Sequence, residues 1–154
     1  MVARKALPET HHVMRYIPAS KRFVDENGEY IGPHTAGFQL REGDNGALSV
    51  TEIEHFGDMN RATRAAAAVA HRASLKSKSL GKQAIFAWAK VSDVVAAGLE
   101  YDRELRVVHD PVDGNPGHAE VRRFTDDDLD LLDYFATEVF QDYETVAAMN
   151  LPDY

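Results

Sequence analysis

The sequence predicts one α+β domain, in which a mixed or mainly antiparallel sheet packs with an alanine-rich central helix and a long acidic C-terminal helix. Three observations indicate this fold class. Strand-like segments separated by turn residues fill the first third of the chain, alanines with helical periodicity follow over residues 59–74, and an apolar stripe of helical spacing covers residues 129–146. With 154 residues, the chain is expected to form one compact domain over 1–154, with flexible ends at 1–10 and 150–154.

The first predicted elements are a strand and a β-hairpin. Residues 12–17 are rich in β-branched and aromatic side chains and are followed by Pro18, which cannot extend a central strand. The segments 22–26 and 29–31 flank an Asn-Gly pair, which suits the positive φ angles of a tight type I′ turn. A hairpin is therefore expected directly after the first strand.

Two further strands and a short helix are predicted next. Residues 38–41 alternate between apolar and polar side chains, a Gly- and Asn-containing turn follows at 43–46, and residues 48–50 form a short strand. Thr51 and Glu54 have the spacing of a capping box, in which each side chain binds the other residue's backbone amide. A short helix is therefore expected to begin at Thr51.

The alanine-rich segment 59–74 is predicted to be an amphipathic helix with a basic outer face. Its expected buried stripe consists of Met59, Ala62, Ala66, Val69 and Ala73. Its expected outer face carries Arg61, Arg64, His71 and Arg72. Such a face is either a solvated charged surface or a surface for RNA, a nucleotide or an acidic protein.

The second half of the chain adds two strands and two helices. Residues 84–89 form an apolar run that predicts a buried strand with Trp88 in the core, and residues 105–108 predict another strand. Residues 93–99 have helical spacing and end near a glycine. Thr125 with Asp128 marks the start of the final helix, whose predicted apolar stripe is Leu129, Leu132, Phe135 or Ala136, Val139, Tyr143 and Val146.

Composition excludes several classes of protein. There is no cysteine, which rules out disulfides, thiolate zinc sites, iron–sulfur clusters and cysteine nucleophiles. The N-terminus has no apolar run of signal-peptide length, and the chain has no stretch of about 18 consecutive apolar residues. We therefore expect a cytoplasmic protein of bacterial type that does not bind a membrane.

The net charge of −8 is distributed unevenly along the chain. Residues 1–90 contain 13 Lys and Arg against 9 Asp and Glu, a balance of +4, whereas residues 91–154 contain 4 against 16, a balance of −12. The segment 126–154 has nine acidic residues and neither Lys nor Arg, so it would repel a phosphate backbone and attract a basic protein. DNA binding through this end is not expected.

The segment from His109 to His118 is the first candidate site, because two histidines and two aspartates lie within ten positions. Asp110 could orient His118 as a general base, or His109, Asp110, Asp113 and His118 could bind a metal through nitrogen and oxygen atoms. The spacing matches no metal-ligand signature, and no metal site is predicted. The alternative is a turn built by Asp-Pro, Asp-Gly and Asn-Pro pairs, with exposed histidines.

A second candidate site begins in the first predicted strand. His12 could protonate a phosphate group that Arg15 binds, and Arg41 could stabilise its charge. Arg15 shares a strand face with Val13 and Ile17, where an arginine either extends to the sheet edge or is held for an anion. Ser49, near the end of a predicted strand, either completes this pocket or is a hydrogen-bonding spacer.

These residues lead to two functional hypotheses. The first is a small enzyme that acts on a nucleotide, nucleic acid or other phosphate-containing substrate by metal-independent acid–base chemistry. Its predicted catalytic residues are His118, Asp110 and His12, and its predicted substrate-binding residues are Arg15, Arg41 and Ser49. No cofactor is predicted, because Walker and dinucleotide-binding motifs are absent. The alternative is an inhibitor or antitoxin-like module that binds a basic protein through its acidic C-terminal helix.

Overall fold

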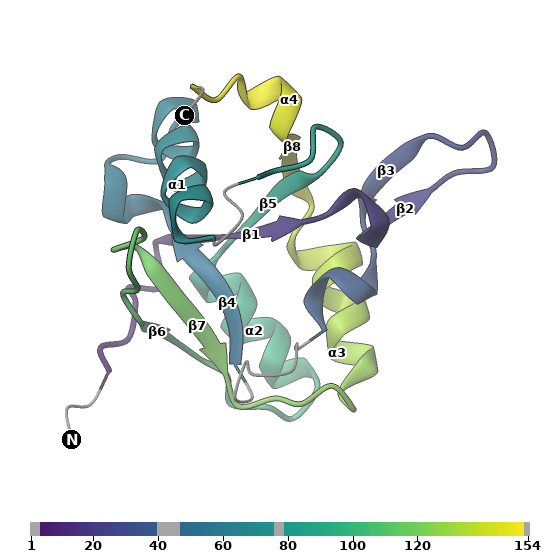
Figure 1. The fold of residues 1–154 in the computed structure, drawn as a ribbon. Helices are drawn as coiled ribbons and strands as arrows, with labels where there is room; N and C mark the ends of the chain where they lie inside the picture. Colours follow the sequence, from purple (N-terminus) through teal and green to yellow (C-terminus); the bar gives the residue numbers. More distant parts are fainter. Residues whose placement is uncertain (1–3, 40–46, 76–78, 153–154) are drawn as a thin grey trace.

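The computed structural model describes residues 4–39, 47–75 and 79–152, which form an α+β fold (Figure 1). Within these residues, six strands form a sheet in the order β6-β7-β4-β1-β5-β8, and each neighbouring pair is antiparallel. The predicted fold class is therefore confirmed. The strands of this sheet are β1 (His12–Ile17), β4 (Ala47–Glu52), β5 (Ile85–Lys90), β6 (Arg106–His109), β7 (His118–Arg122) and β8 (Asp142–Thr145).

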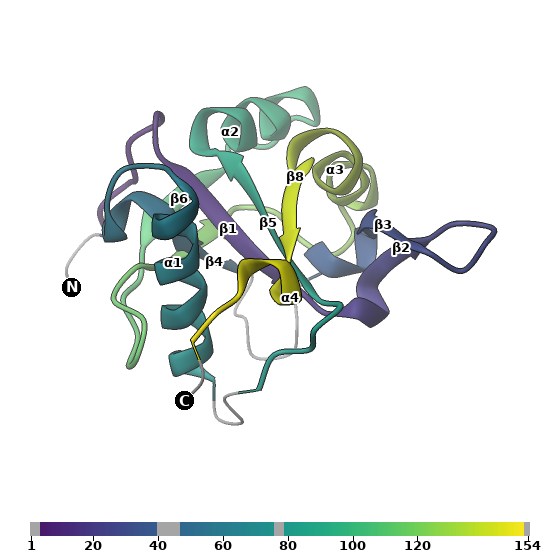
Figure 2. The same cartoon turned by 90° about the horizontal axis from the view of Figure 1, so that it is seen from above.

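Helices lie on both faces of the sheet (Figure 2). They are α1 (Arg61–Ser74), α2 (Val91–Glu100), α3 (Leu129–Tyr134) and α4 (Val146–Met149), and a π-helical segment (Phe135–Val139) continues α3. Side chains of β1 alternate between the two faces: Val13 and Ile17 belong to the core under α2 and α3, and Met14 to the core under α1 and α4. None of the described helices is long and apolar enough to cross a bilayer.

The centre of the sheet contains a gap between β1 and β4. β1 pairs with β5 along its whole length, from His12–Lys90 to Ile17–Ile85. On its other side it pairs with β4 at only two positions, Val13–Glu52 and Met14–Thr51. β1 and β4 therefore separate after Met14, and backbone groups beyond this point must find partners other than the neighbouring strand.

The predicted hairpin is present as β2 (Arg22–Val24) and β3 (Tyr30–Pro33), which form a separate two-stranded sheet that projects from the body of the molecule (Figure 1). The predicted type I′ turn is wrong. Val24 pairs with Tyr30, so five residues form the loop, and only Gly28 within it has a positive φ. The Asp25 carboxylate accepts hydrogen bonds from the loop amides of Asn27 and Glu29, which stabilises the longer connection.

The strand predicted at 38–41 is also wrong at its first residue. Phe38 ends a 3₁₀ helix (Thr35–Phe38). Its ring is buried and packs against Phe140, with 4.9 Å between the ring centroids. The side chain of His34 accepts a hydrogen bond from the amide of Ala36 and caps this turn. The turn predicted at 43–46 lies outside the described residues.

The capping box predicted at Thr51 does not form. Thr51 and Glu52 are the last residues of β4, which continues past the predicted strand at 48–50. A 3₁₀ helix (Ile53–Phe56) follows it without a side-chain cap, and the Glu54 carboxylate binds His12 instead of the amide of Thr51. Tertiary partners thus replace the local hydrogen bonds that the spacing suggested.

The alanine-rich helix is confirmed as α1, which begins after Asn60, whose side chain accepts a hydrogen bond from the amide of Thr63. The predicted buried stripe is wrong. The buried residues are Thr63, Ala67, Ala68 and Ala70, whereas Ala62, Ala66 and Ala73 are exposed. Alanines occur on every side of this helix, so their spacing does not determine which side faces the sheet.

The C-terminal helix is much shorter than predicted. Asp128 accepts a hydrogen bond from the amide of Thr125, as half of a capping box would, and α3 begins at the next residue. The π-helical segment ends where the amide of Phe140 binds the carbonyl of Phe135. The chain then forms β8, in which Tyr143 pairs with Ala87 of β5, so this part of the predicted apolar stripe belongs to the sheet.

Candidate functional site

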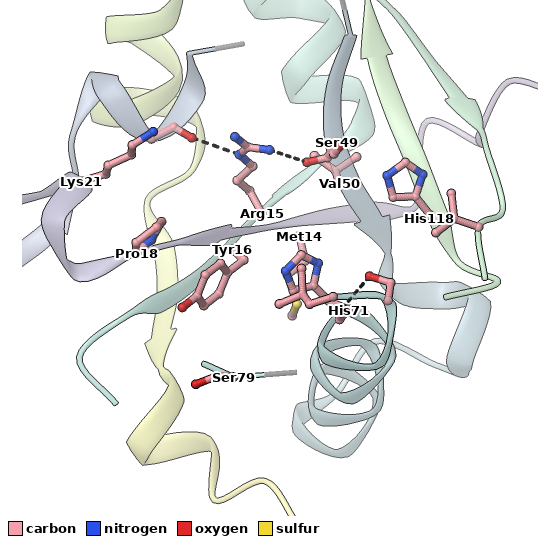
Figure 3. Close-up of a pocket in the computed structure, with 14 residues that line it drawn as sticks. Met14, Arg15, Tyr16, Pro18, Lys21, Ser49, Val50, His71, Ser79 and His118 are labelled. Carbon is pink, nitrogen blue, oxygen red and sulfur yellow. Dashed lines mark hydrogen bonds between the residues drawn. The ribbon is translucent and has the colours of Figure 1, made fainter. Parts of the chain in front are cut away.

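A cavity of about 520 Å³ opens where β1 and β4 separate, between these strands and α1 (Figure 3). This is within the usual volume range of small-molecule sites, about 300–1,000 Å³. Its basic side chains are Arg15, Lys21, His71 and His118, and the described part of the lining contains neither Asp nor Glu. A chain with a net charge of −8 thus has a cavity lined by basic groups.

Arg15 lies in the gap between the two separated strands and is only 6% exposed. Its Nε donates to the carbonyl of Gly37 at 3.0 Å, and its Nη1 donates to the carbonyl of Ser49 at 2.8 Å. The guanidinium therefore binds a β4 carbonyl where the backbone of β1 does not pair with β4. These bonds hold a positive charge in the wall of the cavity, where low solvent access makes its field strong.

His118, the first residue of β7, reaches the cavity from the opposite side (Figure 3). Its Nδ1 lies 2.7 Å from the backbone carbonyl of Asp110 and 3.3 Å from Asp110 Oδ2. Neither a backbone carbonyl oxygen nor an oxygen of an ionised carboxylate can donate a hydrogen bond. The proton between these groups and the imidazole must therefore be on Nδ1. In the neutral ring, Nε2 then has the lone pair, and it forms no hydrogen bond within the described residues.

Ser49 and His71 complete this part of the wall (Figure 3). Ser49 lies on β4, and its carbonyl also binds Arg15. His71 lies on the sheet-facing side of α1, where its ring stacks on Tyr16 with 5.4 Å between the ring centroids. The prediction that His71 lies on the outer face of this helix is therefore wrong. The sequence held no signal for this position, because the alanines around it allow several orientations of the helix.

His12 lies at the other end of β1 and does not line the cavity. Its Nδ1 is 2.7 Å from Glu54 Oε2, and its backbone amide donates to Glu54 Oε1. The predicted convergence of His12 with Arg15 and His118 is therefore corrected: the second imidazole in the cavity is that of His71. Arg41, the remaining predicted residue, lies outside the described part of the chain.

Two other histidines surround one buried glutamate. Glu52 Oε2 is 2.7 Å from Nδ1 of His11, and Glu52 Oε1 is 3.7 Å from Nε2 of His109. His109 therefore points away from His118, so these two ends of the candidate loop have different surroundings. Across the described residues, no group of three or more His, Asp or Glu side chains is arranged to hold a metal ion.

The acidic residues of the described C-terminal region are spread over the turn before α3, α3 itself, the π-helical segment and β8. Some bind groups of the same chain: Asp133 accepts a hydrogen bond from Thr35, and both Asp128 oxygens bind Arg103. The hydrogen bond from Arg103 lowers the pKa of Asp128 below its usual value, despite the opposing effect of burial. A second hollow of about 340 Å³, between α2 and the π-helical segment, is lined by Asp93, Glu100 and Glu138.

Comparison of the chain with protein-family models, curated proteins and solved structures finds no match. We therefore infer function from the geometry and charge of the cavity.

Proposed function

We propose that the cavity binds a phosphate-containing molecule of nucleotide size and that His118 performs metal-independent acid–base chemistry on it. The observation that carries this proposal is the charge of the lining. Arg15, Lys21 and two imidazoles face a space whose described wall contains no carboxylate, although acidic residues outnumber basic ones in the chain. Such a concave basic surface attracts anions and repels cations.

The volume and the apolar part of the wall favour an organic phosphate over a bare anion. Met14, Val50, Leu75 and Val112 contribute apolar surface beside the charged groups. Small-molecule sites commonly combine such a surface with a few polar groups that orient the ligand. A ligand with both a phosphate group and a less polar portion suits this lining better than inorganic phosphate.

The hydrogen bond to Asp110 gives His118 the arrangement of a general base. With Nδ1 bound to the Asp110 carbonyl at 2.7 Å, Nε2 can accept a proton from water or from a hydroxyl that attacks phosphorus. His71 or solvent would return a proton to the oxygen that leaves. Arg15 and Lys21 would stabilise the negative charge on the phosphoryl oxygens.

The alternative is recognition of a basic protein through the acidic residues of the C-terminal region. The hollow lined by Glu138 of this region, together with Asp93 and Glu100 of α2, favours this alternative, because its negative charge attracts a basic protein surface. The two proposals differ in the surface on which substitutions act. Catalysis depends on the cavity and not on this hollow, whereas protein recognition depends on the hollow and not on His118.

The test uses substitutions of two histidines. We expect His118→Ala to reduce turnover about 1,000-fold, within the usual range for a general acid or base. His55→Ala is the control, because His55 is exposed and outside the cavity. Turnover is measured by ³¹P NMR on nucleoside diphosphates, nucleoside triphosphates and dinucleoside monophosphates, and unfolding is measured in parallel.

Binding is tested on the wild-type protein, which carries both histidines. We expect pyrophosphate and adenosine 5′-diphosphate to shift the ring resonances of His118 and leave those of His55 unchanged. If the wild-type protein converts none of these compounds and neither ligand shifts the His118 ring, the proposed function is wrong. Equal loss of turnover in both variants would also contradict it.

A further inference from the structure

Five charged or ionisable side chains form a chain of contacts that ends at His118. Arg122 Nε is 2.7 Å from Glu120 Oε2, and the same oxygen is 3.0 Å from Arg4 Nη1. Arg4 Nη2 is 3.2 Å from Asp110 Oδ1, and Asp110 Oδ2 is 3.3 Å from Nδ1 of His118. Arginines and carboxylates alternate from Arg122 to Asp110, and the Nδ1–H of His118 follows, so each carboxylate lies between two hydrogen-bond donors.

Arg4 is the member of this chain that comes from a distant part of the sequence, more than 100 residues before its partners. Backbone contacts hold its segment against β6: the amide of Leu7 binds the carbonyl of Val107, and the amide of His109 binds the carbonyl of Lys5. Nη2 of Arg106 also donates to the carbonyl of Arg4 at 3.1 Å. The Arg4 side chain is thereby kept beside the loop that carries Asp110.

The two oxygens of Asp110 have different partners. Oδ1 binds Arg4, whereas Oδ2 faces the imidazole. Without Arg4, the carboxylate would lose the partner that fixes its side-chain rotamer, and Oδ2 would no longer be held near Nδ1. The backbone carbonyl of Asp110 would remain as an acceptor, so the effect on the imidazole should be partial.

We propose that Arg4 is a positioning residue for His118: it holds the Asp110 carboxylate so that Nδ1 of the imidazole keeps its proton and Nε2 stays available in the cavity. The effect of Arg4 on catalysis rests on the proposed function. The effect on the imidazole itself does not depend on any substrate. Arg4 acts through Asp110 and does not line the cavity.

The contribution of Arg4 to stability should be small, which allows its positioning role to be measured separately. Its side chain is 43% exposed, and ion pairs of exposed groups contribute little to stability because solvent screens them. Arg103 provides a matched control, because its side chain is 44% exposed and pairs with Asp128 at a site with no contact to His118. Both arginines can be replaced by glutamine without a large change in volume.

The experiment compares Arg4→Gln, Arg4→Lys and Arg103→Gln by ¹⁵N NMR of the histidine rings near neutral pH. We expect Arg4→Gln to lower the fraction of the His118 ring with its proton on Nδ1. We expect Arg4→Lys to restore most of this fraction, because one ammonium group can still bind Asp110, and Arg103→Gln to leave it unchanged. An unchanged His118 tautomer in Arg4→Gln, or an equal change in Arg103→Gln, would overturn the inference.

Kinetics then connect the inference to the proposed function. With a compound that the wild-type protein converts, we expect Arg4→Gln to reduce kcat about tenfold with little change in KM, as expected when a reacting group is misaligned. A tautomer change in a protein without turnover on any phosphate compound would support Arg4 as a positioning residue and refute the proposed function. If the wild-type protein has turnover but Arg4→Gln keeps the wild-type tautomer of His118, the proposed function would be supported and the role of Arg4 refuted.

Discussion

The cavity and the acidic C-terminal region place charge in opposite ways. In the cavity, Arg15 is buried, and two backbone carbonyls from separate segments hold its guanidinium. In the acidic region, Asp126, Asp127 and Asp130 are exposed. A few buried charges can dominate a local field that many solvated ones barely change, because water and salt screen the exposed groups. The negative net charge of the chain therefore agrees with the acidic C-terminal region but not with the basic lining of the cavity.

The largest expected effect tests this contrast directly. Arg15→Met should lower the free energy of unfolding by about 2–4 kcal/mol, because the carbonyls of Gly37 and Ser49 lose a charged donor in a buried place. Arg103→Met makes the same substitution at an exposed ion pair and should cost much less, because solvent screens such pairs. Urea denaturation measures both values. Similar losses in the two variants would show that burial does not separate the two regions.

A smaller effect concerns the anion affinity of the cavity. Lys21→Glu reverses a charge in its lining and should weaken binding of pyrophosphate about tenfold, with a reduced dependence on salt. Glu138→Lys makes the opposite change in the acidic hollow and should leave this affinity unaltered. Isothermal titration at two salt concentrations measures the difference. If Glu138→Lys strengthens binding as much as Lys21→Glu weakens it, overall charge rather than the cavity controls affinity.

The smallest effect is expected at the Arg103–Asp128 pair. Since Arg103 lowers the pKa of Asp128 in the folded chain, the unfolded chain binds the proton more readily. The pair therefore stabilises the fold above the ordinary aspartate pKa, and this contribution is lost as the pH falls through the lower, folded value. Arg103→Ala should flatten this part of the stability curve in acid. Parallel curves for the variant and the wild type would contradict this assignment.

Local patterns in the sequence were sufficient for features that depend on neighbouring residues. Pro18 follows the end of β1 as predicted, and the β2–β3 hairpin forms around its Asn-Gly pair. His118 and Asp110 could be paired because they are only eight residues apart in the sequence. In each case the chemistry that determines the structure lies within about ten residues.

Other features depend on contacts between distant residues. His71 could not be assigned to the cavity, because the alanines of α1 allow several orientations and only the packed sheet selects one. The segment around Tyr143 has helical spacing, yet its backbone pairs with β5, more than 50 residues earlier. The contact of His12 with Glu54 joins residues 42 positions apart, so the sequence does not reveal that His12 lies outside the cavity. Arg4 was missed for the same reason.

The early separation of β1 from β4 has a consequence for how this site could diversify. The cavity is created by the path of the backbone of β1 and β4. The other edge of β1 pairs with β5 along its whole length, which fixes the position of β1. Side chains such as Ser79, Leu75 and Val112 line the cavity without holding the two strands apart. Exchanging them could redirect ligand preference while the architecture persists, so related chains could share this scaffold and accept different molecules.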